Sequence, residues 1–183
     1  MSAPSTTQKS ERPPGREIEN DPGANPCFGC GPDNPDGLHL HFYDDGEVVR
    51  APFVLDERFQ SWPGFANMGI VFTALQEAGA WAIWERLGPS RIDGPTTVTQ
   101  SKPAMVGPLM AEVRVELDGD KARIDAVATQ GGHETLRASW SARRAKPEES
   151  NQLLAAFPDI PRSLKPGFED RAAERPTGQG PPS

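Results

Sequence analysis

The residue types best placed to do chemistry lie in one stretch, GFANMGIVFTALQEAGAWAIWE, at positions 64–85. Its apolar residues predict a buried helix that begins near Asn67, and the first N–H groups of a helix have no acceptor within the helix. These donors and the positive end of the helix dipole stabilise developing negative charge. The side chains of Asn67 and Gln76 are amides, which cannot transfer protons near pH 7. Glu77 is the only carboxylate adjacent to them.

Glu77 has two interpretations that the sequence leaves open. One residue along a helix rotates a side chain by about 100°, so Glu77 need not face the same cavity as Gln76. The surrounding segment is apolar, and an unpaired carboxylate is costly there. Glu77 is therefore one of two things. It is either a buried residue satisfied by a basic or hydroxyl partner in its own subunit, or a catalytic base that lies one residue after Gln76.

Cys27 and Cys30 form a single CxxC. A zinc site would need two more ligands, and the sequence has no second cysteine pair. His39 and His41 share one face of a predicted strand, so a mixed Cys–His site is an alternative that only proximity supports. A redox CxxC would open a helix, whereas Gly and Pro follow here. We therefore expect no metal and no cofactor, and we interpret His39, His41 and His133 as polar residues on the solvent side of strands.

The elements that must position these residues are one helix and several strands. A helix is expected from about Asn67 to about Leu87, stopped by Gly88 and Pro89. Alternating apolar residues and turn residues predict strands at 38–43, 47–55, 96–106, 109–117, 121–130 and 133–144. This order predicts an α+β fold in which a curled antiparallel sheet of about six strands wraps around one long central helix. The open edges of that sheet and the apolar seam predict pairing with a second copy.

Composition sets the domain limits and excludes some classes of partner. Proline is concentrated in residues 1–26 and 146–183, so we expect a disordered N-terminal tail, a folded domain over 27–145, and a Pro-rich C-terminal tail that is partly ordered at most. A net charge of −7 argues against nucleic-acid or anionic-membrane binding. No signal peptide or run of about eighteen apolar residues is present, and with two cysteines we expect a cytoplasmic protein with reduced thiols.

Three ordered segments resemble small acyl-CoA thioesterases of the phenylacetate-pathway (PaaI-like) type, which have the hotdog fold. They are CFGCGPDNPDGLHLHF at 27–42, FQSWPGFANMGIVFTALQEAGAWA at 59–82 and TTVTQSKPAMVGPLMAEVRV at 96–115. The resemblance implies a hotdog fold, a homodimer or dimer of dimers, and an acyl thioester of CoA or of a carrier protein as the small-molecule partner. It also implies that the Cys27–Cys30 segment is a structural cap that leads into the first strand.

The resemblance also implies roles for the residues at the start of the helix. In that family a backbone N–H polarises the thioester carbonyl, and a carboxylate nine residues after a histidine activates water or attacks the carbonyl, usually across the dimer interface. Here Asn67 stands at the histidine, Met68 and Gly69 replace two glycines, Gln76 takes the carboxylate position, and Glu77 matches a second acidic position. Met68 and Gly69 are thus the expected oxyanion donors, Asn67 and Gln76 position water, and Glu77 is the candidate base.

Other residues are candidates for the substrate pocket. Trp62 is expected to wall an acyl pocket, and Thr99 and Ser101 share a strand face from which hydroxyls can bond a thioester or a water. Arg91 and Lys102 are either contacts for a CoA phosphate or ordinary surface charges. The expected function is thioester hydrolysis with an atypical site. The alternatives are non-hydrolytic binding of an acyl thioester or apolar ligand, or a cyclisation or isomerisation in biosynthesis; the acyl group is not identified.

Overall fold

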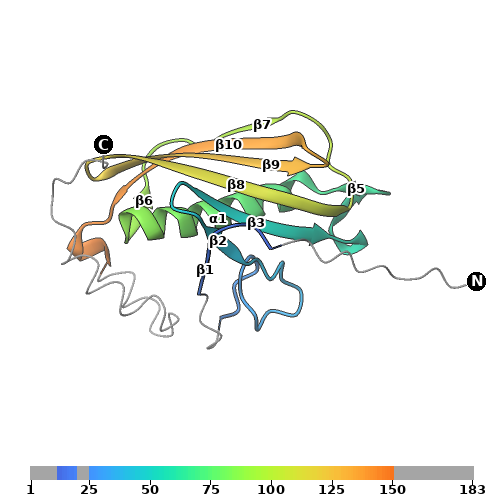
Figure 1. The fold of residues 1–183 in the computed structure, drawn as a ribbon, viewed down its shortest axis with the longest axis horizontal. Helices are drawn as coiled ribbons and strands as arrows, with labels where there is room; N and C mark the ends of the chain where they lie inside the picture. Colours follow the sequence, from blue (N-terminus) through green and yellow to red (C-terminus); the bar gives the residue numbers. More distant parts are fainter. Residues whose placement is uncertain (1–11, 20–24, 151–183) are drawn as a thin grey trace, which may run out of the picture.

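The computed structural model of the chain describes residues 12–19 and 25–150, and most of both predicted tails lies outside these ranges. Within them, eight strands form one antiparallel sheet, and a separate two-stranded ribbon precedes the helix (Figure 1). The sheet order is β1 (Arg16–Ile18), β2 (Phe42–Asp44), β3 (Val48–Leu55), β8 (Gly107–Asp118), β9 (Lys121–Gln130), β10 (His133–Arg144) and β6 (Ser90–Ile92), with β7 (Thr97–Gln100) also paired to β10. The ribbon consists of β4 (Gln60–Trp62) and β5 (Phe65–Ala66), after a 3-10 turn at Glu57–Phe59.

Helix α1 (Met68–Leu87) packs along the face of the sheet formed by β3, β8, β9 and β10 (Figure 1). The predicted helix is confirmed at both ends: Asn67 caps its N-terminus, and Gly88, with φ of 79°, ends it. Buried residues occur on most of its circumference, from Val71 to Leu87. The helix is therefore the core around which the sheet curls, as the nearly continuous apolar sequence predicted.

The strand predicted at 38–43 is wrong for its first four residues, because β2 begins only at Phe42. His39 has a φ of 48°, outside the extended region. The N–H of Leu38 donates to the carbonyl of Phe28 at 2.7 Å, and that of Leu40 to the carbonyl of Gly29 at 2.9 Å. This segment is thus bonded to the CxxC loop rather than to the sheet, although the apolar alternation still buries Leu40.

Other differences concern short strands. Of the strand predicted at 96–106, only β7 is present. The sequence did not predict β1 and β6, because strands of three residues are too short to show an alternation of apolar and polar residues. Strand β1 lies inside the segment predicted as an N-terminal tail; it pairs with β2 and buries Ile18. A single apolar residue among polar neighbours is too little for a strand prediction, and the pairing with β2 provides the rest of its stabilisation.

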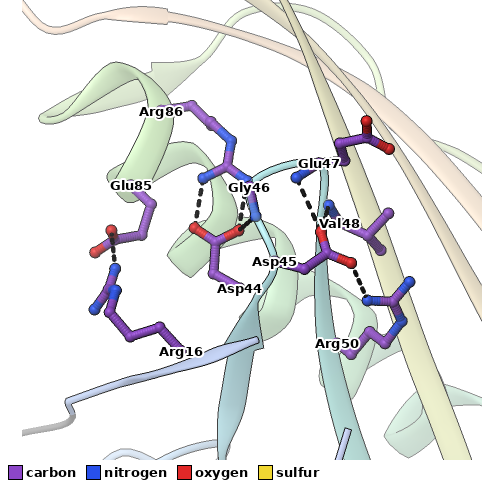
Figure 2. A network of polar contacts seen from close by, with 9 residues as sticks. All are labelled: Arg16, Asp44, Asp45, Gly46, Glu47, Val48, Arg50, Glu85 and Arg86. Carbon is purple, nitrogen blue, oxygen red and sulfur yellow. Dashed lines mark hydrogen bonds and ion pairs between the residues drawn. The ribbon is translucent and has the colours of Figure 1, made fainter. Parts of the chain in front are cut away.

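Ion pairs fasten β1 and the β2–β3 turn to the C-terminal end of α1 (Figure 2). Arg86 donates two hydrogen bonds of 2.6 Å to the carboxylate of Asp44, and Arg16 donates one of 2.7 Å to Glu85. The Asp44 side chain is only 9% exposed, so its bidentate pair is shielded from solvent. The hydrogen bonds from Arg86 hold the pKa of Asp44 below its ordinary value, against the opposing effect of burial.

We expect Asp44→Asn to lower the free energy of unfolding at pH 7 by about 1.5 kcal/mol, the range of a hydrogen bond to a charged group. Since the folded state lowers the pKa of Asp44, this stabilisation is present above the unfolded-state pKa of about 3.9 and is lost as pH falls through the folded-state value. Urea unfolding at pH 7 and near pH 3 measures it, and the difference between the two proteins should shrink at the lower pH. Asp125→Asn, which removes the more exposed pair with Arg123, should cost less than about 0.5 kcal/mol.

Candidate functional site

At the N-terminus of α1, the chain already uses the N–H groups of Gly69 and Ile70. The Asn67 side chain accepts a 2.9 Å hydrogen bond from the Gly69 N–H, and the Asn67 carbonyl accepts one of 3.0 Å from Ile70. Asn67 itself is held by a 2.8 Å bond from its N–H to the carbonyl of Phe59. Met68, the first helical residue, is half-buried, and its N–H has no acceptor within the helix. Of the two predicted oxyanion donors, Met68 can therefore act without release of the cap.

Gln76 and Glu77 diverge from this helix end and from each other. Gln76 is exposed on the helix, whereas Glu77 is half-buried and points toward the CxxC loop. Its Oε2 lies 3.6 Å from the Sγ of Cys27. Glu77 lies nine positions beyond Met68 in the helix, which is about 13 Å along the axis. Within one subunit the structure thus brings Glu77 to the cysteines and not to the predicted oxyanion donors.

The two cysteines and Glu77 shift one another's pKa values. Neither cysteine is in a disulfide. Hydrogen bonds to the Sγ of Cys27 from the Cys30 thiol, and from the Cys30 and Gly29 backbone, lower the pKa of Cys27 to about 5. The pKa of Cys30 is raised, because its thiol is engaged with Cys27 and is buried. Burial, and then the charge of Cys27, raise the pKa of Glu77 to about 7.

The predicted pocket residues lie on exposed elements. Trp62 ends β4 and is 73% exposed, and Thr99 lies on the exposed strand β7 opposite Arg137. The Ser101 hydroxyl donates a 2.7 Å hydrogen bond to Glu134 and is thus already engaged. Lys102 is exposed, as is Arg91, which lies 3.4 Å from the carboxylate of Glu149. All three histidines are exposed, as predicted, although His39 and His41 precede β2 rather than lying in it; His41 lies 3.0 Å from Glu17.

Exposed apolar side chains gather at the start of α1. Phe65, in β5, forms a β-bridge with Met105, and both are more than a third exposed. Trp62 lies in the strand paired with β5. We call Trp62, Phe65 and Met105 the apolar rim. The sequence prediction missed Phe65 and Met105; the Pro-Gly turn at 63–64, which folds β4 onto β5, was the available signal.

Among residues 12–19 and 25–150, no helix is long and apolar enough to cross a membrane. No protein-family model matches the sequence, and no curated protein matches it.

Solved structures do resemble the fold. A mutant of the phenylacetic acid degradation protein PaaI from Thermus thermophilus is 16% identical, with a TM-score of 0.53, over 58% of this chain and 93% of that one. A putative thioesterase related to phenylacetic acid degradation, from Ralstonia eutropha, is 17% identical, with a TM-score of 0.52, over 58% and 85%. A thioesterase from Haemophilus influenzae is 13% identical, with a TM-score of 0.51, over 62% and 83%. These likenesses confirm the hotdog fold predicted from the sequence.

Proposed function

We propose that this chain is a thioesterase-like hotdog protein that binds an acyl thioester at the N-terminus of α1 and hydrolyses it only slowly. One observation carries the proposal. The helix N-terminus keeps a backbone donor and an apolar rim, while the exposed helical position where the resembling family has its carboxylate holds Gln76. The means of binding a thioester are thus present, and a general base at the usual position is lacking.

Binding is proposed to place the thioester carbonyl against the Met68 N–H. This donor and the positive end of a 20-residue helix act where the carbonyl oxygen gains charge. The Gly69 N–H could join only if the 2.9 Å bond to Asn67 opened. Asn67 is therefore proposed to fix the helix end and to orient a substrate or water with its side-chain amide.

The acyl group is proposed to lie on the apolar rim. Trp62, Phe65 and Met105 present apolar surface beside the helix start, which suits an aliphatic or aromatic acyl chain. Their exposure in the single chain and the open edge of β7 support a second copy covering this region. Because the carboxylate of the resembling family usually acts across the dimer interface, we propose that a homodimer, or a dimer of such dimers, places one subunit's Gln76 near the other's Met68. CoA or a carrier protein supplies the thiol, and the reduced cysteines support a cytoplasmic location.

Slow hydrolysis follows from the amide at position 76. Gln76 can hold a water by hydrogen bonds but cannot take its proton, and general-base catalysis is typically worth about 10²–10⁴-fold. The role of Glu77 as a displaced base stays a prediction. Its contact with Cys27 supports instead the alternative that Glu77 is satisfied by a partner in its own subunit.

The test is an assay of thiol release from a panel of aliphatic and aromatic acyl-CoAs, with binding measured in parallel by calorimetry. We expect saturable binding of at least one acyl-CoA, weaker binding of CoA alone, and slow release of thiol. Thiol release at rates typical of enzymes, which have a median turnover of about 10 per second, would contradict the slow hydrolysis. Absence of binding across the panel would contradict the proposal as a whole.

A further inference from the structure

We propose that Cys27, Cys30 and Glu77 form a zinc site that fastens the CxxC loop to the middle of α1. The three residues come from two segments that lie 50 residues apart in the sequence, and the hydrogen-bonding atoms of Cys27 and Glu77 approach within 3.6 Å. The site is separate from the helix N-terminus and does not rest on the function proposed above.

The distances fit a tetrahedral metal. One ligand atom from each residue lies within 4.8 Å of the other two. Zinc binds thiolate at about 2.3 Å and carboxylate at about 2.1 Å, so a tetrahedral angle places sulfur and oxygen about 3.6 Å apart. The separation of Cys27 Sγ from Glu77 Oε2 is 3.6 Å. A single ion can therefore contact these groups after small side-chain movements.

The loop is shaped to direct both sulfurs toward the helix. The Gly31 N–H donates to the Cys27 carbonyl at 2.9 Å, which closes a turn, and the N–H groups of Gly29 and Cys30 are directed at the Cys27 Sγ. A Cβ on Gly29 would overlap the Cγ of Glu77, so only glycine lets the carboxylate reach the sulfurs. A Cβ on Gly31 would overlap the backbone of residues 25 and 27.

Groups around the three candidate ligands also hold them in place. The Trp81 side chain, one turn beyond Glu77 on α1, hydrogen-bonds to Cys30. Asn25 is 6% exposed and accepts a 3.1 Å bond from the Cys27 N–H, while its own N–H donates to Asp33 at 2.9 Å. Outer contacts of this kind orient ligands in metal sites.

The donor set selects the ion. Two thiolates favour zinc over magnesium or calcium, which take oxygen ligands, and a tetrahedral site with three protein ligands completes its shell with one water. Binding takes Cys27 and Cys30 as thiolates and Glu77 as a carboxylate, releases to solvent the protons that these groups still carry, and leaves the metal as Zn²⁺, so no oxidant or reductant is required. The bound ion would join loop and helix where only hydrogen bonds and packing join them otherwise.

The full-length chain, stripped with a chelator and kept reduced, should bind one Zn²⁺ or one Co²⁺ per chain. Because Cys27 and Cys30 are the only cysteines of the sequence, a thiolate-to-cobalt charge-transfer band reports on this pair alone. Zinc should also raise the melting temperature of the stripped protein. Because this measurement uses the wild-type protein, it tests the proposal even if one of the variants below fails to fold.

Variants then identify the ligands. Cys27→Ser and Cys30→Ser should each weaken zinc binding by more than the roughly 10–100-fold that loss of an outer contact causes, and should reduce the cobalt band. Glu77→Gln should weaken zinc binding by at least about 10-fold while the cobalt band persists at saturating metal. Asp36→Asn, an exposed carboxylate beside the same loop, is the matched control and should bind as the wild type does. Circular dichroism of the metal-free proteins checks that each variant is folded.

Two results would overturn the proposal. The first is a stripped wild-type protein that takes up no stoichiometric zinc or cobalt. The second is a folded Glu77→Gln variant with the zinc affinity of the wild type, because the carboxylate would then not be a ligand. Both measurements are made without an acyl thioester, so their outcome is independent of whether the chain binds or hydrolyses one.

Discussion

Gln76→Glu is expected to raise the rate of thiol release from a bound acyl-CoA by about 10²-fold or more. The change exchanges an amide for a carboxylate of nearly the same size at the position where the resembling thioesterases carry their acidic residue. A carboxylate can take a proton from water, and this step is typically worth about 10²–10⁴-fold. Gln76 is exposed on α1 within one subunit, so the new charge should cost the fold of that subunit little stability.

The measurement is kcat and KM for thiol release, with the best substrate of the acyl-CoA panel. The gain should fall in kcat, because the carboxylate acts on the attacking water and not on binding. Gln76→Ala is the matched control and should bind the same acyl-CoA without any gain. If Gln76→Glu is folded, binds substrate and releases thiol no faster than the wild type, this helix position does not face the thioester.

Glu77→Gln distinguishes the two interpretations of that residue in the same assay. If the role of Glu77 is to contact the cysteines of the CxxC loop, the variant should keep the slow thiol release of the wild type. If it is the displaced base, release should disappear. The contact between its Oε2 and the Sγ of Cys27 favours the first result.

Gly79→Ala is expected to destabilise the protein by about 2 kcal/mol, although alanine favours helices over glycine by about 1 kcal/mol. Gly79 is buried in α1 where the helix meets β10, and an added Cβ would overlap the six-membered ring of Trp140. Trp140 is 5% exposed and cannot swing into solvent. Overpacking of a filled core typically costs about 1–3 kcal/mol, occasionally more, and here it exceeds the gain in helix propensity.

A double-mutant cycle with Trp140→Phe tests the cause. Phenylalanine lacks the outer ring atoms that the new methyl group would meet, so Gly79→Ala should cost much less in that background. The free energy of unfolding from urea denaturation, measured for all four proteins, gives the coupling. A Gly79→Ala cost that is the same with and without the Trp140→Phe substitution would show that the indole ring is not the obstacle.

The sequence predicted the long elements well, because their signals are local. An apolar run with an amide cap at Asn67 and a Gly-Pro stop defines a helix without reference to other segments. The strands β3, β8, β9 and β10 alternate or are bounded by Gly turns, and each was predicted within about two residues. The order of these elements and three family-like segments were enough to predict the hotdog fold.

The short elements depended on partners that the sequence does not reveal. Strand β1 forms because it pairs with the edge strand β2. The segment at 38–41 does not join the sheet, because its N–H groups donate to the carbonyls of Phe28 and Gly29. Neither pairing has a period or a turn signal of its own. The apolar rim was only partly predicted for the same reason, since Phe65 and Met105 come together through a bridge between distant segments.

By itself, the sequence determined which residues are available for chemistry: amides at 67 and 76, one adjacent carboxylate at 77, and a single CxxC. Only the tertiary structure decided which of them meet. A helix fixes the angle between neighbouring side chains, but the loop folded against each face depends on long-range packing. Gly29 leaves room for Glu77 at Cys27 and Cys30, so the carboxylate that the sequence offered as a base lies beside two thiols instead.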